Sequence, residues 1–419
     1  MGETKRVVII GAGINGLCSA YYLVRRGHAV TVLDRGTPDT QNCSFGNAGY
    51  VTPSHFIPLA APGMVMMGLK WMRDPESPFY VKPRLAPDLL SWAWQFHRAG
   101  TKAHVERSAP LLRDLNMAAR ALYEELDAVL GHNFGFEKKG LMLLFKSQHA
   151  LDEEGHVVQH AERLGLNAQM LTAQEAQEQN PDVRLDVCGA AYYAEDCHMA
   201  PGALMSALQR ECEKLGVQFQ WNSEAQSWQR NGRRVTAVRT AIGEVSGDEF
   251  VLCGGAWSTG TARELGLKIP MQAGKGYSLT LPKPKQMPAM PMIFVERRVA
   301  ITPLGEQLRI AGTMEIAGLN TDVVPARVRG IVKSVPLYFP EFGESDFTGV
   351  APWVGLRPCS PDGLPYLGRT RKFDNLCIAT GHAMMGLSVG PITGEMIAQT
   401  ISGETPRIAS GLLDVDRFS

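Results

Sequence analysis

The sequence predicts an α/β protein in which a doubly wound parallel sheet is interrupted by inserted α+β segments. Three observations lead to this class. Residues 6–10, 249–253 and 376–380 are short apolar runs, which is typical of parallel strands buried on both faces. Each run is followed by glycine, as expected where strands end at a ligand-binding edge. Between the runs lie helical and strand-like patterns, which indicate insertions into one sheet-based domain.

The first strand runs into a glycine turn that reads Gly11-Ala12-Gly13-Ile14-Asn15-Gly16. Gly11 permits a tight turn, Gly13 lets the backbone approach a pyrophosphate, and Gly16 lets the next helix pack closely. The phosphates of a dinucleotide would lie at the N-terminus of that helix. A second apolar strand, residues 29–33, ends at Asp34, whose carboxylate can accept both ribose hydroxyls of an adenosine. An ordinary glycine turn is the alternative, but the preceding strand and the acid about 20 residues later favour dinucleotide binding.

The size and charge of the chain exclude several other classes. Its 419 residues allow about two to three domain-sized cores, and 45% of them are hydrophobic. The 42 basic residues balance 42 acidic ones without a long basic run, so we expect no nucleic-acid partner. The 8 scattered cysteines indicate free thiols in a reducing compartment. His156 and His160 have the spacing of metal ligands on a helix, but no acid completes a zinc pattern, so we expect no metal.

The inserted segments combine helices with an antiparallel sheet. Helical patterns predict helices at 110–130, 151–164, 196–215 and 391–401. Asn231-Gly232 between two alternating segments predicts a β-hairpin. Segments at 277–281, 299–302 and 307–310, separated by proline and glycine, predict antiparallel strands. We therefore expect a dinucleotide-binding domain made of 1–80, 186–265 and 346–419, and a substrate-binding domain made of 81–185 and 266–345.

Five further motifs, in order along the chain, carry a family resemblance that covers essentially the whole sequence. They are Asn47-Ala48-Gly49, Ala60-Ala61-Pro62-Gly63, Leu69-Lys70-Trp71-Met72, Lys275-Gly276-Tyr277-Ser278-Leu279-Thr280 and the segment 353–368. Through them the chain resembles the bacterial D-amino-acid dehydrogenases of the D-amino-acid oxidase and glycine oxidase superfamily. The resemblance implies a Rossmann-like FAD-binding domain of the glutathione-reductase type, with an inserted α+β substrate domain whose antiparallel sheet roofs the flavin.

Three glycine-rich strand ends agree better with FAD than with NAD. An extended flavin dinucleotide must be held along its length, and segments 11–16, 254–255 and 381–386 would supply three separate contacts. Arg35 would suit a 2′-phosphate, but the adjacent carboxylate would repel one. The cofactor-binding residues that we expect are Gly11, Ala12, Gly13, Ile14, Asn15, Gly16, Asp34, Arg35, Ser44, Asn47, Ala48, Gly49, Gly254, Gly255, Trp257, Gly381, Met384, Met385, Gly386, Leu387 and Ser388.

Some sarcosine-oxidase relatives hold their flavin covalently through a cysteine. The corresponding position in this chain is Gly355, whereas Cys359 lies four residues further along. The resemblance therefore implies FAD that is bound without a covalent bond.

Four residues are expected at the substrate. Arg357 presents a guanidinium fork that matches a carboxylate, and the family's carboxylate-binding arginine lies in this Gly-Leu-Arg-Pro motif; pairing with Asp362 or with a helix end is the structural alternative. The hydroxyl of Tyr277 could bond the carboxylate or the amine, unless it is a core tyrosine. In relatives a Gly-His turn lies near the flavin, so His382 would orient flavin or substrate, unless it is purely structural. His55 is expected to line the pocket.

These features predict an FAD-dependent dehydrogenase that oxidises the Cα–N bond of D-amino or imino acids by hydride transfer to flavin N5. Glycine oxidase relatives carry an arginine where Met384 stands here, beside Met385, so an apolar wall favours small or cyclic substrates such as D-proline or a hydroxyproline. The resemblance implies a quinone or another carrier as electron acceptor. Two alternatives stay open: an oxidase of glycine, sarcosine or another secondary amine that produces hydrogen peroxide, and a non-catalytic flavoprotein subunit of an electron-transfer complex.

Two apolar segments bear on the location of the protein. Residues 64–72 and 89–96 combine methionine and tryptophan with nearby basic residues, as in an interfacial membrane contact; helices packed in a core or over the cofactor are the alternative. The chain enters its first strand within about five residues and has no apolar run of about 18 residues, so we expect neither a secretory signal nor a spanning helix. We expect a cytoplasmic protein, with peripheral contact at the inner face of the cell membrane left open and no prediction of oligomeric state.

Overall fold

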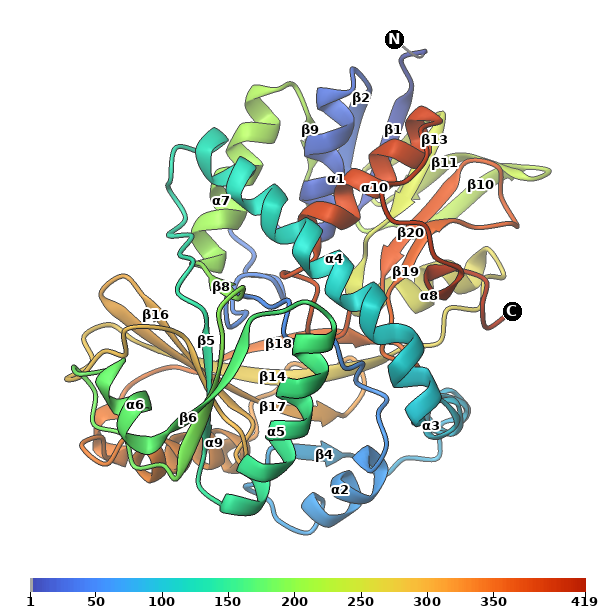
Figure 1. The fold of residues 1–419 in the computed structure, drawn as a ribbon. Helices are drawn as coiled ribbons and strands as arrows, with labels where there is room; N and C mark the ends of the chain where they lie inside the picture. Colours follow the sequence, from blue (N-terminus) through green and yellow to red (C-terminus); the bar gives the residue numbers. More distant parts are fainter. Residues whose placement is uncertain (1–2) are drawn as a thin grey trace.

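The computed structural model describes residues 3–419, which contain two large sheets with helices packed around them (Figure 1). The six-stranded sheet has the order β19-β20-β13-β1-β2-β9. Its strands are β1 (Arg6–Ile10), β2 (Ala29–Leu33), β9 (Gln218–Gln220), β13 (Glu249–Leu252), β19 (Tyr366–Arg369) and β20 (Leu376–Thr380). All neighbours pair in parallel except β19 with β20. The parallel sheet predicted from the three apolar runs is confirmed.

Helices cover one face of this sheet, and a smaller sheet covers the other. The helices are α1 (Ile14–Arg25), α4 (Lys102–Val129), α7 (Pro201–Lys214) and α10 (Gly390–Ser402). They share an apolar core with Val7 and Ile9 of β1, whereas Val8 and Ile10 point to the opposite face, because side chains alternate along a strand. That face is covered by α8 (Ser258–Glu264) and by an antiparallel sheet of β10 (Ser227–Asn231), β11 (Arg234–Thr240) and β12 (Gly243–Ser246).

The nine-stranded sheet has the order β18-β14-β17-β16-β15-β5-β7-β6, with β4 added beside β17. Its strands are β4 (Phe79–Val81), β5 (Leu141–Phe145), β6 (Ala168–Thr172), β7 (Gly189–Tyr193), β14 (Gln272–Leu281), β15 (Met292–Phe294), β16 (Val299–Leu304), β17 (Gln307–Ile316) and β18 (Trp353–Cys359). The predicted antiparallel pairing is confirmed for most neighbours, but β15 with β5 and β17 with β4 pair in parallel. Helix α9 (Pro325–Tyr338) packs on one face of this sheet.

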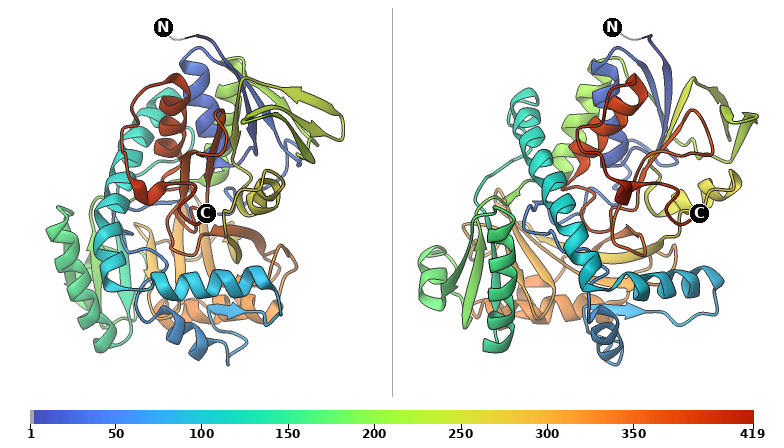
Figure 2. Two further views of the ribbon diagram at one scale, coloured as in Figure 1. Left: turned by 90° about the vertical axis from the view of Figure 1, so that its right-hand side faces the viewer. Right: turned by 45° about the vertical axis from the view of Figure 1, so that its right-hand side comes forward.

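The long helix α4 connects the two parts of the molecule. Figure 2 shows it running beside both of them, and both chain termini lie in the part that holds the six-stranded sheet. Leu115 and Leu122 of α4 belong to the core of the six-stranded sheet, whereas Ala109 and Leu112 pack with β5 and with α5 (Gln148–Arg163). The remaining elements are β3 (Tyr50–Val51), β8 (Cys197–His198), α2 (Met64–Trp71), α3 (Pro87–Ala99), α6 (Ala173–Glu178), η1 (Gly255–Trp257), η2 (Glu344–Phe347) and η3 (Gly411–Leu413).

Two predicted helices differ in extent from the observed ones. Helix α4 begins at Lys102 and carries Pro110 in its interior, because Thr101 caps the helix by accepting from the backbone N–H of His104. The helix predicted at 196–215 begins only at Pro201, since residues 197–198 pair as β8 with β3. The hairpin at Asn231-Gly232 is confirmed by the pairing of β10 with β11.

The two sheets do not follow the predicted domain boundaries throughout. Strands β7 and β18 lie in segments that we assigned to dinucleotide binding, yet both belong to the nine-stranded sheet. We therefore propose a division that follows the sheets and places 189–193 and 353–359 with the substrate-binding part.

Candidate active site

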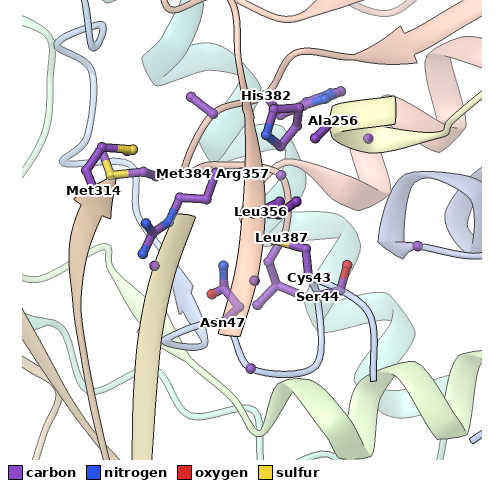
Figure 3. A pocket seen from close by; sticks show the side chains of 18 of the residues that line it. Cys43, Ser44, Asn47, Ala256, Met314, Leu356, Arg357, His382, Met384 and Leu387 are labelled. Carbon is purple, nitrogen blue, oxygen red and sulfur yellow. The ribbon is translucent and has the colours of Figure 1, made fainter. Parts of the chain in front are cut away.

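A cavity of about 990 Å³ lies where the two large sheets meet. Its lining comes from the ends of β1, β2 and β13 and from one face of β14, β16, β17 and β18. Figure 3 shows side chains from separate segments of the chain, among them Asn47, Arg357 and His382, grouped around one space. The position agrees with the rule that ligands bind beyond the carboxyl ends of parallel strands.

The glycine turn forms one end of the cavity. Gly11 has φ +108°, and a Cβ on Gly16 would lie 1.8 Å from the carbonyl oxygen of Gly11, so only glycine fits there. Helix α1 begins directly afterwards at Ile14, and its N-terminal residue Gly13 offers no capping side chain. The hydroxyl of Ser44 accepts from the backbone N–H of Ile14 at 3.1 Å. Gly13, Ile14 and Asn15 line the cavity, and the first N–H groups of a helix have no intrahelical partner, which suits an anion.

Asp34 is fixed at the end of β2 by two backbone donors. Its carboxylate oxygens accept from the N–H of Ala12 and of Gly36, each at 2.7 Å, which leaves each oxygen with further lone pairs. The guanidinium of Arg35 lies 3.7 Å from the ring centroid of Trp257, and both residues line the cavity. The guanidinium is thus held flat against an indole beside a carboxylate.

The loop that contains residues 44–49 is held by the nine-stranded sheet. Arg309 donates to the carbonyls of Phe45 and Asn47 at 3.0 and 2.8 Å, and Thr302 donates to the carbonyl of Ala48 at 2.6 Å. Burial lowers the pKa of Arg309 to about 10. Sequence reasoning missed this arginine, although an arginine inside the predicted strand 307–310 is an available signal.

Arg357 lies on the cavity face of β18. Its guanidinium lies across Gly276, where a Cβ would be 2.3 Å from Nη1, and Nη1 donates to the carbonyl of Thr313 at 2.7 Å. The alternative of a pair with Asp362 is wrong, because Asp362 pairs with Arg417 at 2.8 Å. Within residues 3–419, no carboxylate lies within 4.0 Å of the Arg357 guanidinium. A free guanidinium therefore borders the cavity.

The comparisons with known proteins agree with this geometry. The family model described as DAO, FAD dependent oxidoreductase, matches residues 6–400. The chain belongs to this family of FAD-dependent oxidoreductases. D-amino acid dehydrogenases from Bradyrhizobium diazoefficiens and Methylobacterium radiotolerans are 31% and 33% identical, each with 99% of both chains covered. Among solved structures, glycine oxidase from Geobacillus kaustophilus has a TM-score of 0.79 at 21% identity, with 99% of both chains covered.

The residues present fit FAD as the cofactor of this oxidoreductase. The glycine cradle and Asp34 form one end of an extended cavity, and segments 254–257 and 384–388 line it further along. Asn15 supplies an independent sign, since its buried Oδ1 has no hydrogen-bond partner within residues 3–419. A buried acceptor of this kind requires a donor such as a ligand hydroxyl.

Four of the expected FAD-binding residues do not line the cavity but support those that do. Ala12 donates its N–H to Asp34, and Gly16 packs against Gly11. Gly49 and Gly381 have φ near +88° and +80°, and a Cβ on them would lie 2.2 Å from the carbonyl oxygen of Met199 and 2.7 Å from Tyr366, respectively. The remaining expected residues border the cavity.

Tyr277 does not direct its hydroxyl toward a substrate. The hydroxyl donates to Glu315 at 3.0 Å and accepts from the backbone N–H of Val324 at 3.3 Å. Glu315 in turn pairs with the buried Lys275 at 3.3 Å. Burial, with the Glu315 charge beside it, raises the pKa of the Tyr277 hydroxyl. This geometry favours the alternative of a structural tyrosine in the core under the nine-stranded sheet.

His382 is completely buried at the turn after β20. Its Nδ1 lies 3.0 Å from Asn15 Nδ2 and its Nε2 lies 3.0 Å from Thr393 Oγ1. Because Nδ1 accepts from the amide, Nε2 carries the proton and donates to Thr393. Burial lowers the pKa of His382 to about 3, so the ring is neutral at pH 7. The histidine thereby orients Asn15 at the start of α1 and has no nitrogen left for a substrate.

His55 borders the cavity, as its place in the sequence led us to expect. Its Nδ1 lies 3.1 Å from Ser54 Oγ, and because that hydroxyl donates its one proton to the buried Asp196 at 2.5 Å, it accepts from His55 Nδ1. Burial, with the charge of Arg298 nearby, lowers the pKa of His55 to about 4. Burial raises the pKa of Asp196 to about 8. A neutral imidazole therefore lies on this wall at pH 7.

Trp353 and Thr313 complete the floor and were not recognised individually in the sequence. The Trp353 indole lies between Gly46 and Gly355, where a Cβ would be 2.0 and 2.1 Å from ring atoms. Thr313 has φ +71°, which is rare for a β-branched residue. Segment 353–368 was identified as a motif, but a left-handed threonine has no sequence signal. Among residues 3–419, no three His, Cys, Asp or Glu side chains group closely enough to hold a metal.

Proposed function

We propose that the protein is a dehydrogenase that oxidises the Cα–N bond of a D-amino or imino acid whose carboxylate binds Arg357. The free guanidinium of Arg357 at the cavity is the single observation that carries this proposal. Its Nη1 is fixed on the carbonyl of Thr313, so its remaining N–H groups can face a carboxylate in a constant orientation. The full-length relatives named D-amino acid dehydrogenase support the same substrate class.

The residues around Arg357 serve to position the substrate. Gly276 and Gly355 face each other across β14 and β18, and their missing side chains let the Arg357 guanidinium lie over Gly276 and the Trp353 indole over Gly355. Figure 3 shows Met314 and Met384 beside Arg357, where they form an apolar wall. When bound, FAD supplies the acceptor for the hydride that leaves Cα. Burial lowers the pKa values of the two imidazoles on the cavity wall, His55 and His382, which makes both of them weak bases, so orientation of a neutral amine substrate replaces general-base catalysis.

FAD without a covalent bond is part of the proposal. Gly355 stands where a covalent attachment would need a nucleophile, and Cys359 is fully buried beside Met314. Burial raises the pKa of the Cys359 thiol to about 12, which keeps it unreactive. Acid precipitation should leave all yellow colour in the supernatant. Colour retained in the pellet would contradict this part.

An electron acceptor at a membrane, such as a quinone, is a further part of the proposal. Within residues 3–419 no helix is both long and apolar enough to cross a bilayer. Helices α2 and α3 instead expose Met66, Leu69, Leu90 and Trp94, with Lys70 in the same segment. Such a mixture of apolar and basic side chains suits an interfacial contact. The protein should therefore co-sediment with vesicles that contain anionic phospholipid. Trp94→Glu should reduce this binding, whereas Leu215→Glu, just after the end of α7, should not.

The proposed function is tested by anaerobic reduction. D-amino and imino acids should bleach the flavin spectrum, and the L-enantiomers should do so at least about tenfold more slowly. Reduced protein should then reoxidise rapidly with a soluble quinone and slowly with oxygen. Rapid reoxidation in air with formation of peroxide would establish the oxidase alternative. A flavin that no amino acid bleaches, in wild type and in Arg357→Ala alike, would establish the non-catalytic subunit.

A further inference from the structure

A second guanidinium borders the same cavity. Arg298 lies in the turn between β15 and β16 and has φ +52°, a left-handed conformation that non-glycine residues seldom adopt. Its side chain remains accessible, and the cavity is the space that it lines. A strained backbone that aims a charged side chain at a cavity is typical of functional positions.

Arg298 has no partner in the protein. Within residues 3–419 its guanidinium makes neither a hydrogen bond nor an ion pair within 4.0 Å. The charges of Glu154 and Glu296 act on Arg298 from a distance, but both carboxylates are hydrogen-bonded elsewhere. Glu154 accepts from the Tyr193 hydroxyl and Glu296 from the Tyr338 hydroxyl, each at 2.6 Å. The positive charge on this wall is therefore available to a ligand.

Arg357, on β18, and Arg298, in the turn before β16, line the same cavity against the nine-stranded sheet. Val354, Tyr277, Gly312 and Val299 are aligned on the adjacent strands β18, β14, β17 and β16. Tyr277 and Val299 belong to the core with α9, whereas Arg298, in the turn just before Val299, lines the cavity. 

Both arginines are also displaced toward the same end of the sheet. Arg298 precedes Val299 on β16, and Arg357 follows Val354 on β18; two strands lie between them, and β18 runs antiparallel to β16. Three strand spacings separate their backbones by roughly 14 Å, and two long side chains extend into that span. The floor between them consists of Gly276, Thr313 and Ala300, which leaves room for a small extended ligand.

We propose that Arg298 binds a second carboxylate, so that the preferred substrates are amino or imino acids with two carboxylates. This inference rests on the proposed function, in which Arg357 holds the first carboxylate. The second carboxylate would belong either to the side chain, as in D-glutamate, or to the nitrogen substituent, as in an N-carboxyalkyl amino acid. Proline-like substrates have one carboxylate and would leave Arg298 unpaired, so they are the weaker candidates.

Binding of unreactive ligands provides the first test, because it does not depend on turnover. Holoenzyme is titrated with glutarate or butyrate, and the change in the flavin absorbance gives the Kd of each. We expect glutarate to bind the wild type at least about tenfold more tightly than butyrate. Arg298→Leu should abolish this preference, and Arg298→Lys should retain part of it. The adjacent, exposed Arg297 does not line the cavity, so Arg297→Leu is the matched control and should behave as wild type.

Substrate comparison provides the second test and separates the two proposals. D-glutamate is compared with D-glutamine, and iminodiacetate with sarcosine, in anaerobic flavin reduction by wild type and Arg298→Leu. Preference for a diacid in either pair, lost in Arg298→Leu, supports the proposal and identifies the source of the carboxylate. Equal rates with diacids and neutral analogues would overturn this inference while leaving the proposed function intact. Loss of FAD from Arg298→Leu but not from Arg297→Leu would overturn it as well, because Arg298 would then hold the cofactor.

Discussion

The guanidinium of Arg357 donates to the carbonyl oxygen of Thr313 at 2.7 Å, and Thr313 presents that carbonyl from a left-handed backbone with φ +71°. The pairing of β14 with β17 shifts register at this point, between Lys275 and Tyr277. The irregular strand thus turns a carbonyl toward the cavity, where it fixes the direction of the arginine.

Removing the guanidinium of Arg357 should abolish substrate oxidation without releasing FAD. Arg357→Leu should lower kcat/KM at least about 100-fold, and Arg357→Lys should be nearly as impaired, because an ammonium cannot reproduce the bidentate fork. Steady-state kinetics with flavin content determined in parallel checks this. The exposed Arg239 on β11 supplies the control, since Arg239→Leu should leave both quantities unchanged. Wild-type kinetics in Arg357→Leu would refute the assignment.

Replacing Thr313 by glycine should separate stability from binding. The left-handed backbone costs a β-branched residue about 1–2 kcal/mol, so Thr313→Gly should raise Tm. The same change should loosen the carbonyl that fixes Arg357 and raise KM more than it lowers kcat. Thermal unfolding and kinetics on one preparation measure both effects. A lower Tm would show that the Thr313 side chain stabilises the folded protein by more than the left-handed backbone destabilises it.

Gly16→Ala should prevent FAD binding. The added methyl group would lie 1.8 Å from the Gly11 carbonyl oxygen, a separation that only a shift of the turn or of α1 can relieve. We expect colourless protein with a lowered Tm. Gly260 on α8 is the matched control because a Cβ there meets no atom within 4 Å, so Gly260→Ala should be yellow and at least as stable as wild type. Stoichiometric FAD in Gly16→Ala would contradict the expectation.

The buried group formed by Lys275, Glu315 and Tyr277 should affect stability rather than catalysis. Glu315→Ala removes the carboxylate that faces the buried ammonium of Lys275 and should cost about 3 kcal/mol of unfolding free energy. Tyr277→Phe removes one hydroxyl bond and should cost about 1 kcal/mol, with KM unchanged. Denaturant unfolding and kinetics measure these quantities. A large rise of KM in Tyr277→Phe would instead show that the hydroxyl contacts the substrate.

Asp196 should make stability depend on pH. Burial raises its pKa to about 8 in the folded protein, whereas the unfolded chain has the ordinary value of about 4. Between these values the folded state binds more protons, so the free energy of unfolding should fall as pH rises from about 4 to 8. Asp196→Asn cannot titrate and should flatten this slope, with the largest gain in Tm relative to wild type near pH 9. Parallel curves for both proteins would exclude Asp196 as the cause.

Local sequence patterns were sufficient to predict the structure of the dinucleotide-binding segment at the start of the chain. The runs at 6–10 and 29–33 and the glycine turn between them became a strand, a tight turn and a helix, because each requirement is met within a few residues. Residues contributed by distant strands were harder to assign. Arg309 acts through backbone carbonyls about 260 positions away, and the hydroxyl of Tyr277 points to the opposite face of its sheet, so neither could be deduced from neighbouring residues.

The bonds from Arg309 and Thr302 to the loop of residues 44–49 have a consequence for how such enzymes can be recombined. A chimera that exchanges the nine-stranded sheet for that of a relative would also exchange the supports of a loop encoded near the other end of the gene. Substrate specificity cannot then be transplanted as an independent module. Arg309 and Thr302 must be exchanged together with the loop. Otherwise the affinity for flavin will change along with the substrate specificity.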